Sequence, residues 1–246
     1  MHCNFQLALR QTHTFFMKLK QDIKIAVDAI VFGYAENTLS VLLIKQKFGE
    51  LKQQWALVGG FVRDDEPLVA AVNRELYEET GIRVNFLEQL YTFGDNIHRD
   101  PRFRVISVAY YALVNSTELN PQADTDAEEA QWFPVNALPP LAFDHRQIIE
   151  TAISRLKNKL TYQPIGFDLL PEEFPFSELE NLYTTILDRE IDRRNFRKKI
   201  LGFGILEETE KFGGKKSGRP AKLYTFNKSK YKHLTENGFH FEINFA

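Results

Sequence analysis

Apolar and β-branched residues dominate two neighbouring segments near the start of the chain, 23–34 (IKIAVDAIVFGY) and 39–45 (LSVLLIK). The polar stretch Glu36-Asn37-Thr38 separates them, so the pattern predicts two strands joined by a turn. Apolar residues at helical spacing predict helices over 67–80 and over about 144–159. Further short apolar runs predict strands within 55–62, 84–94, 103–115 and 131–135. Interleaved strands and helices predict a mixed α/β or α+β first domain.

A different pattern begins after residue 160. Residues 162–176 (YQPIGFDLLPEEFPF) contain three prolines and little periodicity, which favours a linker. Ser177 and Glu180 have the spacing of a capping box, and Asp192 is a good N-cap for a second helix with an apolar face. Two short strands, ILEET and KLYTF, then flank a glycine-rich turn. The order helix, turn, basic helix, basic hairpin predicts a winged helix-turn-helix. The predicted boundaries are 1–20 for an N-terminal extension, 21–160, 161–176 for the linker, and 177–246.

Composition narrows the class of protein. The chain has 246 residues, of which 43% are hydrophobic and 26% charged, which is typical of a globular protein with two domains. No apolar run approaches the roughly 20 residues that a membrane span needs. Cys3 is the single cysteine, which excludes an intramolecular disulfide and a cysteine-based zinc site. We therefore expect a cytoplasmic protein with no membrane association.

The net charge of −2 conceals an asymmetry along the chain. Residues 189–232 contain 14 Lys/Arg and 5 Asp/Glu, a local balance of +9 that leaves −11 for the remainder. A basic segment of this kind favours a polyanionic partner such as DNA, although a merely solvated basic surface remains an alternative.

The predicted helix at 67–80 carries a cluster of carboxylates. Glu75, Glu78 and Glu79 have the spacing i, i+3 and i+4, which places them on one helix face beside Arg74. Like charges at this spacing are unfavourable without a counter-charge. Hard divalent cations such as Mg²⁺ favour carboxylate oxygens and bridge to phosphates. An exposed acidic helix is the alternative.

The segment GFVRDDEPLVAAVNRELYEETGI (60–82) resembles the Nudix signature at every defining position. The resemblance covers about residues 20–160 and implies a Nudix α/β/α sandwich with a mixed sheet. It implies Mg²⁺ or Mn²⁺, if the protein is catalytic, held by Glu75, Glu78 and Glu79. It also implies catalytic roles for Arg74, Glu78 and Glu79, with Arg74 orienting the carboxylates and Glu66 bracing the loop. Candidates for an additional base or metal ligand outside the signature are Glu128, Glu129, Asp95 and Asp100.

Further blocks resemble the Nudix-related transcriptional regulator family, in order WALVGGFV, HRDPRFRVISVAYYAL, LAFDHRQII, IGFDLLP and DRRNFRKKI. This resemblance spans about 20–230. It implies a Nudix domain that binds an ADP-ribose-like nucleotide or a sugar such as a pentose, and a winged helix that binds operator DNA. Ligand-binding candidates are Gly60, Glu66, Arg102 and Arg104, since guanidinium groups suit phosphates; ordinary surface arginines are the alternative for the last two. Residues 143–145 (FDH) either bind ligand or, as we favour, cap the following helix through Asp144.

In the basic segment, cations alternate with an apolar stripe formed by Phe196, Ile200 and Phe203. The candidate DNA-binding residues are Arg193, Arg194, Asn195, Arg197 and Lys198 on the helix, and Lys215, Lys216 and Arg219 in the wing. A symmetric homodimer on a palindromic site is expected. The leading hypothesis is a ligand-responsive transcriptional regulator. The rival hypotheses are an active Mg²⁺-dependent hydrolase of ADP-ribose or a related nucleoside diphosphate derivative, favoured by the intact glutamates, and a pure interaction module.

Overall fold

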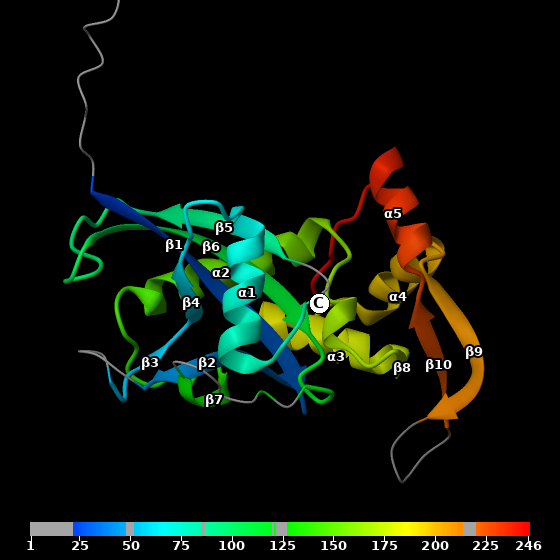
Figure 1. Ribbon diagram of the computed structural model, residues 1–246. Helices are drawn as coiled ribbons and strands as arrows, with labels where there is room; N and C mark the ends of the chain where they lie inside the picture. Colours follow the sequence, from blue (N-terminus) through cyan, green and yellow to red (C-terminus); the bar gives the residue numbers. More distant parts are fainter. Residues whose placement is uncertain (1–21, 48–51, 85–86, 120, 122–126, 214–219) are drawn as a thin grey trace, which may run out of the picture.

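The computed structural model describes residues 22–47, 52–84, 87–119, 121, 127–213 and 220–246. Its first unit is a sheet flanked by two helices, and its second unit is a small helical domain with a three-stranded sheet (Figure 1). The elements of the first unit are β1 (Ile23–Ala35), β2 (Thr38–Gln46), β3 (Trp55–Ala56), β4 (Val58–Phe61), α1 (Leu68–Thr80), β5 (Glu88–Phe93), β6 (Arg104–Val114), β7 (Ala127–Pro134) and α2 (His145–Tyr162).

The large sheet is mixed. The central strand β1 pairs in parallel with β6, from Ile23 opposite Arg104 to Gly33 opposite Val114, and antiparallel with β2 and β4. Strand β5 extends the sheet beyond β6, while β3 and β7 both pair with β2. The expected mixed sheet is therefore confirmed, and the sequence pattern predicted the positions of nearly all of its strands.

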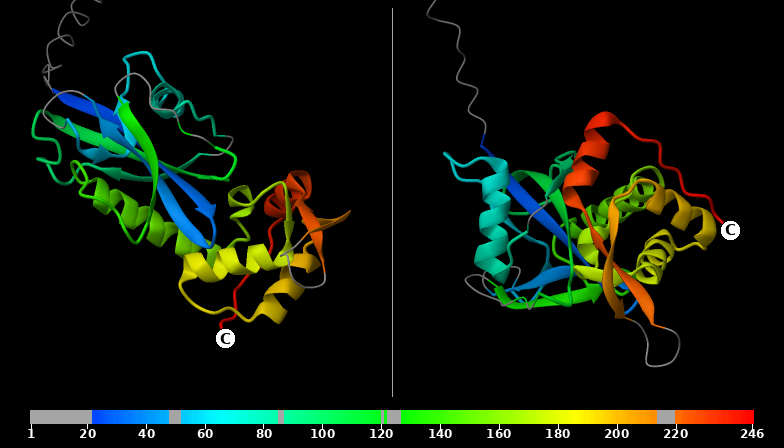
Figure 2. Two further views of the ribbon diagram at one scale, coloured as in Figure 1. Left: turned by 90° about the horizontal axis from the view of Figure 1, so that it is seen from below. Right: turned by 90° about the vertical axis from the view of Figure 1, so that its right-hand side faces the viewer.

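Successive side chains of β1 point to opposite faces of the sheet, and those on both faces are apolar, so both faces of the sheet are covered. Val27, Ala29 and Val31 pack with the buried side of α1, whereas Ile30 and Phe32 pack with α2. All five side chains are fully buried. The near-continuous apolar run of this strand is therefore the sequence signature of a strand with a helix on each side. Figure 2 (left) shows the strands lying between α1 and α2.

The second unit has the order of a winged helix-turn-helix. Its strands form one antiparallel sheet in the order β8-β10-β9. The elements are the short 3₁₀ helix η1 (Phe167–Leu169), β8 (Glu173–Pro175), α3 (Phe176–Leu187), α4 (Arg193–Gly202), β9 (Leu206–Gly213), β10 (Ala221–Phe226) and α5 (Lys228–Asn237). The side chain of Asp192 accepts from the backbone N–H of Asn195 at 3.0 Å, so the predicted N-cap of α4 is confirmed.

Two details of the second unit differ from expectation. Helix α3 begins at Phe176 after Pro175 and has no side-chain cap, so the capping box predicted at Ser177 does not form. The stretch in which the sequence predicted a linker contains η1 and β8, and β8 pairs with β10. The prolines interrupt the hydrophobic periodicity that would have predicted regular elements. The segment is nevertheless packed, because Phe167 and Phe174 are buried in the core.

The two units share one hydrophobic core. It runs from the α2 side of the large sheet through α3 to α4 and the C-terminal residues. Those residues return across the helix-turn-helix: the Asn244 carbonyl accepts from the backbone N–H of Asp192 (2.9 Å), and Ile243 N–H donates to Thr161 at the end of α2 (3.3 Å). In the described part of the chain, no helix is long and apolar enough to cross a membrane.

Candidate functional site

Arg74, on α1, contacts three glutamates, one in the loop that precedes the helix and two on the helix itself. Its guanidinium donates to Glu66 from Nε (2.7 Å) and Nη2 (2.8 Å), and from Nη1 to Glu75 (2.6 Å) and Glu78 (3.1 Å). Nη2 also donates to the carbonyl of Phe61 at 3.2 Å. Hydrogen bonding by Arg74 lowers the pKa of Glu66 to about 2. One guanidinium thus supplies the counter-charge that the spacing of the glutamates requires.

Gly59 and Gly60 are needed for close approach rather than for a tight turn, because neither has a positive φ. A Cβ atom on Gly60 would lie 2.3 Å from a carboxylate oxygen of Glu75, and one on Gly59 would lie 2.2 Å from the carbonyl of Val27. Gly59 N–H donates to the buried Glu79 carboxylate at 3.0 Å. The glycine pair therefore lets β4 lie directly against the glutamates of α1.

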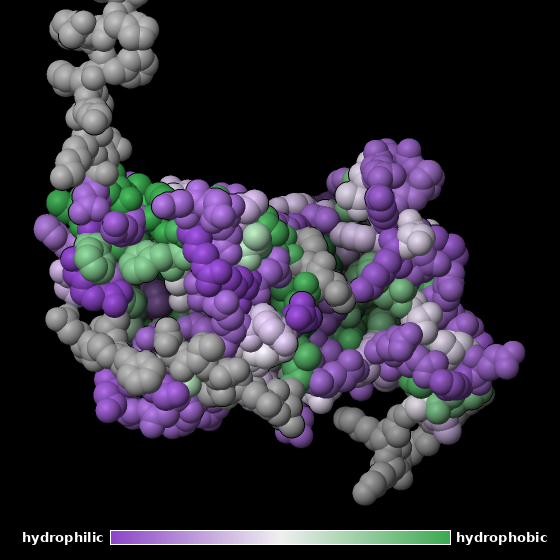
Figure 3. All heavy atoms as spheres, viewed as in Figure 1, coloured by the Kyte–Doolittle hydropathy of each residue, from purple (hydrophilic) through white to green (hydrophobic). Residues whose placement is uncertain are grey.

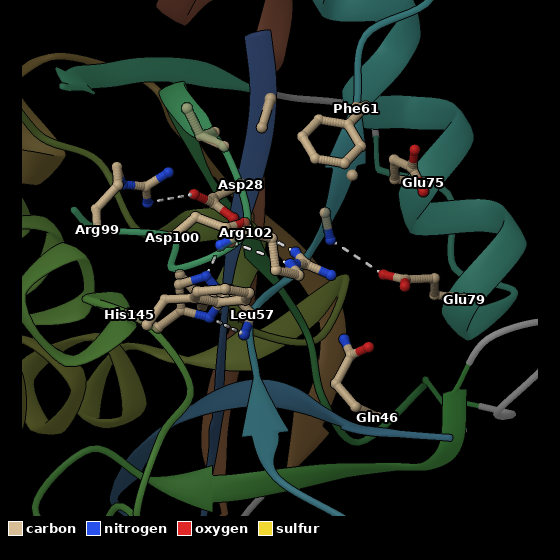
Figure 4. Close-up of a pocket in the computed structure, with 15 residues that line it drawn as sticks. Asp28, Gln46, Leu57, Phe61, Glu75, Glu79, Arg99, Asp100, Arg102 and His145 are labelled. Carbon is tan, nitrogen blue, oxygen red and sulfur yellow. Dashed lines mark hydrogen bonds and ion pairs between the residues drawn. The ribbon is translucent and has the colours of Figure 1, made fainter. Parts of the chain in front are cut away.

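A cavity of about 290 Å³ opens beside β4 and α1 (Figure 4). Of the residues that the sequence singled out, seven line it: Gly60, Glu75, Glu79, Asp100, Arg102, Phe143 and His145. Burial raises the pKa of Glu75 despite the opposing effect of Arg74. Glu66, Glu78 and Arg104 are not among the lining residues; the first two instead contact Arg74.

Arg102 is held at the wall of this cavity by Asp100. Its Nε and Nη2 atoms donate to the two carboxylate oxygens of Asp100 at 3.0 and 2.8 Å, and its backbone N–H donates at 2.9 Å. Burial alone would raise the pKa of Asp100, but Arg102 lowers it overall. The guanidinium also lies 5.4 Å from the ring centroid of Phe143. Arg104, the first residue of β6, points its Nη1 toward the carbonyl of Val105 instead (3.5 Å).

A buried charge network forms part of the cavity wall, and two of its members that line the cavity, Asp28 and Arg99, were not among the candidates from the sequence. Arg99 is 7% exposed and donates two hydrogen bonds to Asp144, at 2.9 and 2.7 Å, and a longer one to Asp28 at 3.4 Å. The Ser107 hydroxyl donates to the same oxygen of Asp28 at 2.5 Å. Burial by itself would lower the pKa of Arg99, but its hydrogen bonds and ion pairs with the two aspartates raise it on balance. These residues come from β1, β6, the loop before β6 and the start of α2.

His145, the first residue of α2, completes this network. Its Nδ1 accepts from the backbone N–H of Leu57 at 2.9 Å, so the proton of the neutral ring lies on Nε2, which faces Asp28 at 3.4 Å. Burial lowers the pKa of His145, which keeps the ring neutral near pH 7. Asp144 stands at the N-cap of α2 as expected, but its carboxylate makes no capping hydrogen bond, because Arg99 engages it.

The remaining candidates for an additional base lie away from the cavity. Glu128 accepts from Gln53, and Glu129 pairs with Lys45 at 2.9 Å; both are on β7. Asp95 is exposed. Neither β7 glutamate nor Asp95 lines the cavity.

The glutamates match a hard divalent cation in donor type, because all three offer carboxylate oxygens from one helix face. Glu75 and Glu79 both line the cavity. In the structure, however, Glu75 and Glu78 are turned to Arg74. Among the described residues, no group of three or more acidic, histidine or cysteine side chains is arranged to hold a metal ion.

Helix α4 presents a basic surface opposite its buried residues Phe196 and Ile200. Arg194 and Lys198 are exposed, and Arg193 lies 3.8 Å from Glu180 and from Glu190. Asn195 is partly buried and Arg197 exposed.

Arg197 also has a packing role. Its guanidinium lies 4.5 Å from the ring centroid of Phe176 and donates to the Tyr224 hydroxyl at 3.2 Å, which ties α4 to β10. The wing candidates Lys215, Lys216 and Arg219 lie outside the described residues.

Comparison with known families identifies both units. A model of the NUDIX domain matches residues 22–152, and a model of the NrtR DNA-binding winged helix domain matches residues 166–226. A curated relative from Acinetobacter baylyi, the ADPR responsive transcriptional repressor NtrR, is 38% identical over 206 residues, which cover 81% of this chain and 80% of the relative. The chain belongs to the NrtR family of Nudix-related transcriptional regulators.

The solved structures agree with this membership. The crystal structure of Shewanella oneidensis NrtR complexed with a 27mer DNA superposes with a TM-score of 0.76 at 32% identity, over 85% of this chain and 95% of that one. The Nudix unit alone is similar to the ADP-ribose pyrophosphatase of Methanocaldococcus jannaschii, with 44% identity over 128 residues, covering 51% of this chain and 70% of the relative. The predicted NrtR-family fold, a Nudix sandwich followed by a winged helix, is therefore confirmed.

Proposed function

We propose that this chain is a transcriptional repressor that binds operator DNA through its winged helix and releases it when ADP-ribose occupies the Nudix cavity. The observation that supports this proposal most strongly is similarity along most of the chain to two proteins. One is a regulator crystallised on DNA, and the other is a repressor named for its response to ADPR. The protein acts in the cytoplasm as a homodimer, so that two copies of α4 read the two halves of a palindromic site.

The chemistry of the cavity supports ADP-ribose over an uncharged sugar. Arg102 presents a guanidinium suited to the phosphate oxygens, with Gly60 and Glu66 shaping the loop beside it. Phe61 lines the cavity, and its ring lies 6.2 Å from that of Phe103, both being more than 40% exposed. Exposed aromatic faces of this kind stack on an adenine base. We keep Arg104 as a candidate at the outer edge of the same site.

On the DNA side, α4 enters the major groove. Arg194 and Lys198 are exposed and contact phosphates or base edges. The candidates Arg193, Asn195 and Arg197 surround them, and Lys215, Lys216 and Arg219 of the wing contact the backbone or minor groove.

The direct test is binding of the full chain to DNA from its own upstream region, followed by fluorescence anisotropy. ADP-ribose should release the DNA in a saturable manner, and AMP or ribose 5-phosphate at the same concentration should not. DNA binding that arabinose abolishes and ADP-ribose leaves unchanged would assign the effector to the sugars.

A second activity, hydrolysis of ADP-ribose, is favoured by the complete glutamate set and by the 44% identity to an ADP-ribose pyrophosphatase. Glu75, Glu78 and Glu79 would hold Mg²⁺ or Mn²⁺, which screens the pyrophosphate and activates water when bound. Arg74 holds the carboxylates in place. Release of AMP from ADP-ribose with Mg²⁺, lost in Glu79→Gln, would establish catalysis. If the protein binds ADP-ribose but does not hydrolyse it, regulation would be its only function.

A further inference from the structure

Residues 239–245 (FHFEINF) form a strap that follows α5 and runs beside α4 (Figure 2). Apolar and polar residues alternate along it, and burial follows the same alternation. Phe241 is 3% and Ile243 7% exposed, whereas the three polar residues between the apolar ones are exposed. A period of two indicates an extended segment with one face on the core. The strap lies beyond residues 166–226, which match the winged-helix domain.

The apolar face of the strap belongs to the core that both units share. Figure 3 shows hydrophobic side chains in the hollow between the two units, in contrast to the mainly hydrophilic outer surface. The rings of Phe239 and Phe241 lie 5.8 and 6.1 Å from that of Phe203, the residue that follows α4. Phe245 forms a bridge with Ile191, just before α4 begins. The strap therefore packs against both ends of α4.

Two consecutive residues of the strap join the end of α2 to the start of α4. Ile243 donates its backbone N–H to the carbonyl of Thr161, in the last turn of α2, at 3.3 Å. The carbonyl of Asn244 accepts from the backbone N–H of Asp192, the N-cap residue of α4, at 2.9 Å. The hydrogen-bonded path from one helix to the other thus passes through only these two residues of the strap.

A third hydrogen bond holds the middle of α4. The Nζ atom of Lys199 donates to the carbonyl of Glu242 at 2.5 Å. With about 3.6 residues per turn, Lys199 projects from a different side of α4 than Arg194 and Lys198, the exposed candidates for DNA contact. The strap therefore contacts the start, the middle and the end of α4 and leaves the surface proposed for DNA open.

These hydrogen bonds constrain α4 in a way that apolar packing does not. Helix α3 also packs between α2 and α4, but packed helices can slide past one another by small amounts. Hydrogen bonds weaken steeply when their geometry departs from the optimum. A shift of the last turn of α2 must therefore move the strap, and with it α4, or break the bond at Thr161. The first residue of α2, His145, lines the Nudix cavity.

We propose that the strap is the positioning element through which α2 sets the tilt of α4, so that Ile243 and Asn244 carry the response of DNA binding to ADP-ribose. This inference rests on the proposed function, because it needs ADP-ribose in the Nudix cavity and DNA on α4. Neither strap residue belongs to either binding surface. Both act through the helices that they join.

The test compares the dissociation constant for upstream DNA with and without saturating ADP-ribose, and the ratio of the two constants measures the coupling. Ile243→Pro removes the N–H that bonds to Thr161, whereas Ile243→Val is of similar volume and keeps it. The ratio should fall roughly threefold or more in Ile243→Pro and stay at the parent value in Ile243→Val. Calorimetry without DNA should give the same ADP-ribose affinity for both variants.

Lys199→Met tests the strap from the side of α4, and it decides the question if circular dichroism shows that Ile243→Pro does not fold. Its lost charge affects DNA binding equally with and without ADP-ribose, so the ratio still reports the coupling. The ratio should fall in Lys199→Met, and Lys199→Arg, which keeps a donor, should restore it.

A strap with a structural role alone would give variants with a lower thermal midpoint and weaker DNA binding but the ratio of the parent. That result in a folded Ile243→Pro, or in Lys199→Met if the proline variant is unfolded, would overturn the proposal. A parent chain that binds DNA with a ratio of 1 would instead overturn the proposed function on which the inference rests.

Discussion

Arg99 donates two hydrogen bonds, of 2.9 and 2.7 Å, to Asp144, the N-cap residue immediately before α2. Through Asp28 the same guanidinium reaches the central strand β1. Helix α2 then runs from this network to the winged helix, where its last turn contacts the C-terminal residues at Thr161. The first turn of the helix thus lies at the Nudix cavity and its last turn at the DNA-binding unit.

We expect Arg99→Met to destabilise the fold by about 3–5 kcal/mol, because it leaves the buried Asp28 and the partly buried Asp144 without their guanidinium partner. Urea unfolding followed by circular dichroism measures this change. The double variant Arg99→Met/Asp144→Leu should recover part of the loss, since it removes one of the two stranded charges. If the double variant is no more stable than the single one, the pair does not act as a unit.

Gly60→Ala should weaken ADP-ribose binding at least tenfold. Its Cβ would lie 2.3 Å from a carboxylate oxygen of Glu75, so either β4 or that side chain has to move. Isothermal titration calorimetry gives the affinity. Gly202→Ala is the matched control, because a Cβ there meets no atom within 4 Å, and its ADP-ribose affinity should be unchanged. An unaltered affinity in Gly60→Ala would show that the contact with Glu75 is not needed for binding.

The fold was largely accessible from the sequence, because period-two and helical patterns report which face of an element is buried. The near-continuous apolar run of β1, which is buried on both faces, and the apolar stripe of α1 are examples. The packed segment after α2 was not accessible, since three prolines erase periodicity even where Phe167 and Phe174 are buried.

The functional site likewise contains residues that the sequence predicted and residues that it did not. Glu75, Glu78 and Glu79 were visible because their spacing on one helix has a chemical meaning by itself. Asp28 and Arg99 were not, because each is a single polar residue whose partners come from distant elements. An aspartate within the apolar run of β1 was the one available signal, since a charge buried in a strand needs a partner.

The Arg74–Glu66 pair should stabilise the protein at every pH above the ordinary glutamate range. The pKa of Glu66 falls from 4.5 to about 2 in the folded state, so its contribution is complete above about pH 4.5 and is lost as the pH falls toward 2. Glu66→Gln should therefore lower the thermal midpoint at pH 7, and the difference from the parent should shrink between pH 4.5 and 2. Melting curves across this range test the sign; a gap that widens on acidification contradicts it.

Arg194→Ala and Lys198→Ala should each weaken DNA binding across sequences and lower the slope of log affinity against log salt by about 1, if each contacts one phosphate. Anisotropy at 50–200 mM salt measures the slope. Lys52→Ala removes an exposed lysine from the Nudix unit and serves as the control, with no change expected. Equal slopes for all three variants would remove α4 from the DNA interface.

The most direct test of the whole account is a titration of ADP-ribose into the complex of the full chain with its upstream DNA, read by anisotropy, for the parent and for Arg102→Ala. The account predicts saturable release of DNA from the parent, and in Arg102→Ala unchanged DNA affinity with release shifted to much higher ADP-ribose. Failure of the parent to bind any duplex at low salt, or DNA binding that ADP-ribose does not alter, would contradict it.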